Sequence, residues 1–73
     1  MIDKEFIRNF VTLLDTFTVE ELDAYEVGIM QGIEQLQRGS DARRDLQFIL
    51  RRIQAEKIAR IEVLAIAQKK RQQ

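Results

Sequence analysis

The chain has 73 residues with twelve basic and twelve acidic side chains, so its formal net charge is zero, and it contains no cysteine, histidine or proline. A core built from so few residues is marginal by itself and often needs a partner subunit. Without cysteine or histidine, the common nucleophile–base pairs and transition-metal sites cannot be assembled. We therefore expect a non-enzymatic protein with no cofactor, no metal and no small-molecule substrate.

The charges are divided unevenly along the chain. Residues 1–37 carry eight acidic and two basic side chains, whereas residues 38–73 carry ten basic and four acidic ones. Such a division can hold two halves of one fold together, pair two copies, or present a basic helix to a polyanion. The sequence leaves these three uses open.

The composition is that of an all-α protein, because helix-forming residues dominate and glycine occurs only three times. No segment is long and apolar enough to cross a bilayer, and the first residues lack the pattern of a signal peptide. We expect a single helical domain over residues 1–73, located in the cytoplasm and not bound to a membrane.

A short first helix is expected over about residues 3–15. Asp3 is a suitable N-cap, and apolar residues recur from there every three or four positions. The apolar face is broad and comprises Phe6, Ile7, Phe10, Val11, Leu13 and Leu14. A helix with so wide an apolar face should be covered on more than one side, so we expect core packing with added burial in a dimer.

The second helix is expected over residues 19–38. Thr18 and Glu21 have the spacing of a capping box, in which each side chain bonds the backbone amide of the other residue. Gly39 would supply a left-handed C-cap at the far end.

Three small residues in this second helix recur every four positions and form a close-packing groove: Ala24, Gly28 and Gly32. Each helix-interior glycine costs about 1 kcal/mol relative to alanine, so a packing use is indicated. Either the neighbouring helix of the same chain crosses closely here, or a partner does. The sequence supports both interpretations about equally.

The third helix is expected over residues 41–70, capped by Ser40 or Asp41, and it would overhang the second because it is about 45 Å long. One apolar stripe, containing Ile49 and Ile53, would face the first two helices. A second stripe lies roughly opposite and comprises Phe48, Ala55, Ala59, Val63 and Ile66. Since a surface helix of a monomer carries one stripe, the second predicts a dimer or partner interface. The alternative is that these are scattered exposed apolar residues.

The same helix offers candidate nucleic-acid contacts at Arg43, Arg44, Gln47, Arg51 and Arg52. These side chains suit phosphate and guanine. They can instead pair with the acidic second helix, and the zero net charge favours this use because dedicated nucleic-acid binders have a high pI.

Together these patterns predict an all-α bundle of three helices, short, medium and long, completed by dimerisation. We expect a small regulatory or adaptor protein that acts by helix-mediated protein–protein interaction as a homodimer. The alternatives are a DNA- or RNA-binding regulator that uses the basic third helix, and a structural assembly subunit. Whether the two copies would be parallel or antiparallel is left open by the sequence.

Overall fold

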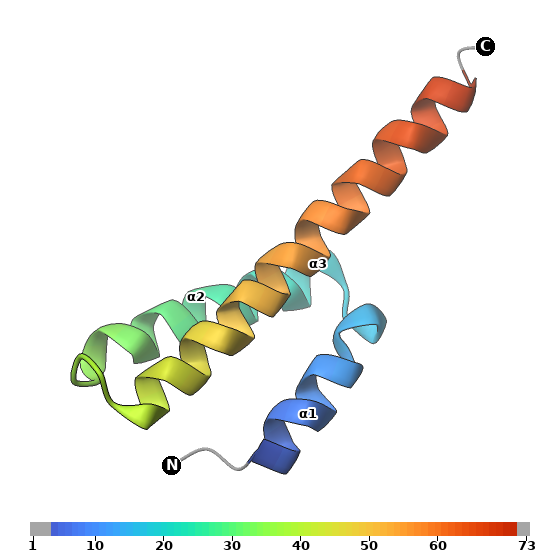
Figure 1. Ribbon diagram of the computed structural model, residues 1–73. Helices are drawn as coiled ribbons and strands as arrows, with labels where there is room; N and C mark the ends of the chain where they lie inside the picture. Colours follow the sequence, from blue (N-terminus) through green and yellow to red (C-terminus); the bar gives the residue numbers. More distant parts are fainter. Residues whose placement is uncertain (1–3, 72–73) are drawn as a thin grey trace.

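The computed structural model describes residues 4–71, and this part of the chain is helical apart from short turns (Figure 1). The elements are α1 (Lys4–Thr12), the 3-10 helix η1 (Leu14–Thr16), α2 (Val19–Gln35) and α3 (Asp41–Arg71). No strand occurs among these residues, so the predicted all-α class is confirmed. None of the described helices is both long enough and apolar enough to cross a membrane.

The first helix is shorter than predicted, because α1 ends at Thr12 rather than near residue 15. The amide of Leu13 donates to the carbonyls of both Asn9 and Phe10, at 3.2 and 3.1 Å, and this shared bond tightens the last turn. The chain continues as η1, which turns Leu14 into the core (4% exposed) and leaves Leu13 half exposed. The predicted N-cap Asp3 lies outside the described residues.

The start of α2 confirms the predicted capping box. The amide of Glu21 donates to Oγ1 of Thr18 at 3.1 Å, and the amide of Thr18 donates to Oε1 of Glu21 at 3.0 Å. Phe17 precedes the cap and packs against the core that contains Leu22, which holds the entering chain as a hydrophobic staple does.

The end of α2 differs from the prediction. The helix stops at Gln35, three residues before the expected end, because Leu36 takes an extended backbone with φ −98° and ψ 149°. Gly39 does adopt the predicted left-handed conformation, with φ 81°. It serves the turn into α3, however, and is not the residue that ends α2.

α3 begins at Asp41, and Ser40 is its N-cap, since Oγ of Ser40 accepts the amide of Arg43 at 3.2 Å. The helix contains 31 residues and ends at Arg71, close to the predicted boundary. At 1.5 Å per residue it is about 46 Å long, which accounts for most of the 51 Å length of the molecule.

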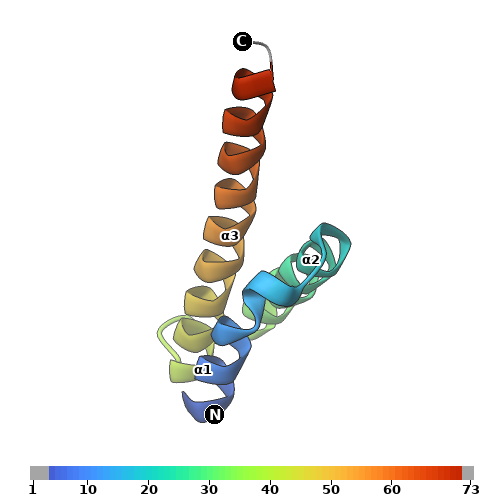
Figure 2. The same ribbon diagram turned by 90° about the vertical axis from the view of Figure 1, so that its right-hand side faces the viewer.

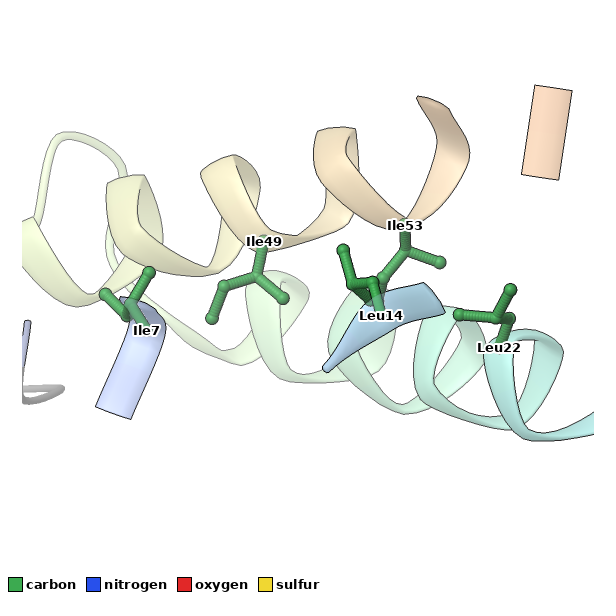
Figure 3. Packing of buried hydrophobic residues seen from close by; sticks show 5 residues of the cluster. All are labelled: Ile7, Leu14, Leu22, Ile49 and Ile53. Atoms are coloured by element: carbon green, nitrogen blue, oxygen red, sulfur yellow. The ribbon is translucent and has the colours of Figure 1, made fainter. Parts of the chain in front are cut away.

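The other three elements pack against the first half of α3, and the second half projects beyond them (Figure 1). Figure 2 shows α2 inclined to α3 rather than parallel to it. Every helix contributes to one apolar cluster around the first half of α3 (Figure 3), formed by Ile7, Leu14, Leu22, Ile49 and Ile53. Ile49 and Ile53 face inward as predicted, at 3% and 0% exposure.

Candidate functional site

The second half of α3, residues 58–69, is here called the projecting segment. It carries five large apolar side chains that are each more than half exposed: Ile58, Ile61, Val63, Leu64 and Ile66. Successive residues of a helix are about 100° apart, so these side chains point in most directions around the axis. A helix that is apolar on most sides is normally buried, and an exposed one marks a surface that binds something.

The predicted interface stripe is exposed at all five positions: Phe48, Ala55, Ala59, Val63 and Ile66. Ala59 and Val63 line a hollow of about 420 Å³ together with Val19 at the start of α2. Ala55 lines a second hollow of about 190 Å³ together with Val11 of α1, and Asp15 and Leu14 of η1. Glu56 borders both hollows, so they adjoin along one side of α3; we call this surface the α3 furrow.

The opposite wall of the α3 furrow escaped the sequence analysis. Val11, Leu14 and Val19 come from α1, η1 and the first turn of α2, and they are far from Ala59 in the chain. No local pattern links them, because the turn through η1 decides which side of α3 they reach. The helical spacing of the stripe itself was the only available signal.

Ion pairs within the chain join the acidic N-terminal half to the basic C-terminal half. Nζ of Lys57 in α3 lies 2.5 Å from Oδ1 of Asp23 and 3.1 Å from Oε1 of Glu26, both in α2. The hydrogen bonds to Asp23 and then to Glu26 raise the pKa of Lys57 above its usual 10.5. The acidic and basic halves are therefore joined at this point, as one of the three uses predicted.

Arg60 binds two groups beside the furrow. Its Nε donates to Oε1 of Glu56 at 3.0 Å, and its Nη2 donates to the carbonyl of Leu14 at 3.1 Å. Among the described side chains, Asp15 and Lys69 make no ion pair. The end of the furrow beside η1 thus holds the carboxylates of Asp15 and Glu56 together with the basic Arg52, while α3 itself ends in a basic run.

The predicted close-packing groove on α2 is occupied at one end only. A methyl group at Gly32 would lie 3.4 Å from Cδ1 of Leu46, so α3 approaches closely there. A methyl group at Gly28 would meet nothing within 4 Å, and Ala24 is exposed. The intramolecular interpretation holds at Gly32, and the rest of the groove faces outward.

The candidate nucleic-acid residues are divided between two sides of α3. Arg43, Arg44 and Gln47 line a hollow of about 260 Å³ together with Arg38. Arg43 also has a structural bond, since its Nη1 donates to the carbonyl of Leu36 at 3.1 Å just after α2 ends. The other two candidates are exposed outside this hollow: Arg51, and Arg52, which lines the α3 furrow.

No group of three or more metal-ligating side chains within the described part of the chain is placed to hold a metal ion. Comparison of the chain with protein-family models, curated proteins and solved structures finds no match. What the protein does has therefore to be inferred from its own surfaces.

Proposed function

We propose that the protein is a non-enzymatic adaptor that works as a homodimer, in which a second copy covers the α3 furrow and the projecting segment. One observation supports this most: the projecting segment exposes five large apolar side chains that the chain itself does not cover. Two such segments packed together form the seam of a helical bundle that the short chain cannot complete by itself.

The size and shape of this surface suit a helix-mediated dimer. A standard interface takes about 800 Å² from each partner, roughly an eighth of the 6066 Å² surface of this chain. Burying a valine, leucine or isoleucine fully contributes about 1.5–3 kcal/mol, and these side chains are already partly covered. Ala55 and Ala59 lack bulky side chains, so another helix can approach α3 closely along the stripe.

The adaptor role needs a further surface for a protein partner, and α2 offers one. Its exposed side carries Glu20, Gln31 and Glu34, and also Asp23, which binds Lys57 of α3. The open end of the close-packing groove, at Ala24 and Gly28, is also exposed. Such a surface suits a partner with basic side chains, because opposite charges steer association and set its specificity.

Light scattering at two salt concentrations tests the dimer directly. We expect a mass of two chains that does not change with salt, since apolar contacts dominate the seam. Ala59→Glu places a charge in the furrow and should give single chains. The control is Gln54→Glu, an exposed position outside the furrow, which should remain a dimer.

Two results of this experiment would reject the dimer. A wild-type mass of one chain would leave the projecting segment for a different partner, and an Ala59→Glu variant with unchanged mass and stability would make the stripe ordinary surface. A mass of many chains would favour the structural assembly subunit instead.

A nucleic-acid regulator is the second candidate, and one specific observation favours it. Arg38, Arg43 and Arg44 gather with Gln47 around one hollow at the start of α3. This proposal predicts that the chain binds a short DNA duplex with an affinity that falls steeply as salt rises. Arg44→Ala is the suitable variant, because Arg43 also holds the carbonyl of Leu36.

A further inference from the structure

We infer that the two copies are antiparallel, and that each lays the end of its α3 along the α3 furrow of the other. This inference rests on the proposed homodimer and adds its orientation, its register and the occupant of the furrow. Three features carry it: the sizes of the side chains along the stripe, the placement of charge at the two ends of the furrow, and the continuity of the two hollows.

The side-chain sizes along the stripe match in one orientation. Ala59 and Ile66 lie on the same side of α3, about two turns apart, with Val63 between them. In an antiparallel pair centred near Val63, Ala59 faces the partner's Ile66, so a small side chain receives a large one. In a parallel pair each side chain instead faces its own copy, small against small and large against large, so the width of the seam varies along its length.

The charges favour the same orientation. The register that sets Ala59 against the partner's Ile66 also sets Glu56 against the partner's Lys69. Asp15 lies beside Glu56 at the same end of the furrow and has no ion pair within its own described chain. Arg52 lines the same hollow, and Glu56 already binds Arg60. The basic end of one α3 therefore meets the carboxylate of Asp15 in particular, and the antiparallel helix dipoles add to this attraction.

A parallel pair would bring like charges together. The run Lys69-Lys70-Arg71 would lie beside the same run of the partner at the tip of the dimer. The residues from Val63 to Arg71 include no acidic side chain that could neutralise this run. Like charges at such separations repel each other.

The furrow is long enough for this helix end. The two hollows share Glu56 and together extend along α3 from Arg52 to Leu64. In the antiparallel register the partner's Ile66 lies at the larger hollow and the partner's Lys69 at the smaller one. One helix end thus covers both hollows, as well as the apolar wall made by Val11, Leu14 and Val19.

Engineered cysteines test the orientation without interference, because the chain has none of its own. A disulfide needs Cα atoms roughly 4.4–6.8 Å apart. Val63→Cys lies near the centre of the antiparallel seam and should form covalent dimers on oxidation. Ile66→Cys alone should not, since its own copy lies about 10 Å farther along the axis. An equilibrated mixture of Ala59→Cys and Ile66→Cys should cross-link, although neither variant does so alone.

Gln54→Cys is the matched control, being exposed on α3 but outside the furrow, and it should stay uncross-linked. Non-reducing electrophoresis and light scattering are applied to every variant. Strong cross-linking of Ala59→Cys alone and of Ile66→Cys alone would show a parallel seam and overturn the orientation, while leaving the homodimer intact. Cross-linking of Ile66→Cys without Ala59→Cys would overturn the register. Dimeric mass without any of these cross-links would place the seam elsewhere and also overturn the inference. Single chains in all samples would reject the homodimer itself.

Discussion

The guanidinium of Arg60 donates to the carbonyl of Leu14 at 3.1 Å, and so ties the middle of α3 to the 3-10 turn that follows α1. The bond joins residues far apart in the chain, and it is the second one that this carbonyl accepts, since the amide of Phe17 also donates to it at 3.3 Å. Glu56 accepts from Nε of the same side chain and fixes its direction. This cation thus holds η1 in place beside the α3 furrow, where Leu14 and Asp15 form part of the wall.

Arg60→Ala should destabilise the fold by about 1–2 kcal/mol, because a hydrogen bond from a charged donor is lost and the carbonyl of Leu14 keeps only the amide of Phe17. Urea unfolding at one fixed chain concentration measures the loss. The control is Arg44→Ala, which removes an exposed arginine and should change stability by less than about 0.5 kcal/mol. Equal effects of the two substitutions would contradict a specific role for Arg60.

Two glycines should respond to alanine in opposite directions. Gly28 lies inside α2 with open space around it, so Gly28→Ala should stabilise the chain by about 0.5–1 kcal/mol through helix propensity. Gly39 has φ 81°, so Gly39→Ala should destabilise it by about 1–2 kcal/mol. Thermal unfolding of both variants checks the pair. A destabilised Gly28→Ala would show that α2 needs a bare backbone there.

The contact of Lys57 with Asp23 and Glu26 should make stability fall at high pH. These hydrogen bonds raise the pKa of Lys57 in the folded chain above 10.5. Their contribution is therefore complete below pH 10.5, and it is lost as the pH rises from there through the raised value. Unfolding of wild type and of Lys57→Met, followed in urea across this range, should show their stability difference shrinking only above pH 10.5.

The same series with Lys4→Met supplies the control for Lys57. Lys4 is exposed, makes no ion pair among the described residues and lies outside the proposed seam, so its removal should leave the pH profile unchanged. A difference between wild type and Lys57→Met that stays constant through about pH 11 would contradict the raised pKa, because the ordinary value is 10.5.

The capping box should contribute measurably to α2. Thr18→Ala removes the acceptor for the amide of Glu21 and should cost about 1 kcal/mol of stability. Thr18→Ser keeps the hydroxyl and should cost far less. Circular dichroism and urea unfolding of both variants separate the cap from the packing of the threonine methyl, because a loss common to both would point to the methyl group.

Two apolar-to-alanine substitutions, one in the core and one on the surface, should differ in how much stability they cost. Ile53 is 0% exposed and Val27 is 54% exposed. Ile53→Ala should cost about 2–5 kcal/mol and can unfold a chain this small, whereas Val27→Ala should cost less than about 0.5 kcal/mol. The milder Ile53→Val, at about 0.5–1.5 kcal/mol, gives a measurable transition if the alanine variant does not fold.

Local signals in the sequence predicted local structure well. Thr18 and Glu21 lie three residues apart, and this spacing alone specifies the capping box that starts α2. The conformation of Gly39 and the inward direction of Ile49 and Ile53 were likewise predictable, from a residue type and from helical periodicity. The stripe of α3 was found in the same way, and three of its residues, Ala55, Ala59 and Val63, line the α3 furrow.

Other features depended on contacts between distant residues. Periodicity continued the first helix to about residue 15, but α1 ends at Thr12 and the chain tightens into η1, where Leu14 is buried in the core at 4% exposure. Arg43, a candidate for phosphate contact from the sequence, also holds the carbonyl of Leu36, a bond the sequence analysis did not predict. No spacing in the sequence encodes these partners, because they meet only after the chain has turned.

By itself, the sequence determined the helical class, the start of α2, the length of α3 and the two apolar sides of α3, since each follows from residue types at fixed spacing. Only the tertiary structure decided where the core ends on α3. Leu14 and Leu22 can cover the region around Ile49 and Ile53, but the short elements that carry them reach no farther, so the projecting segment is left exposed.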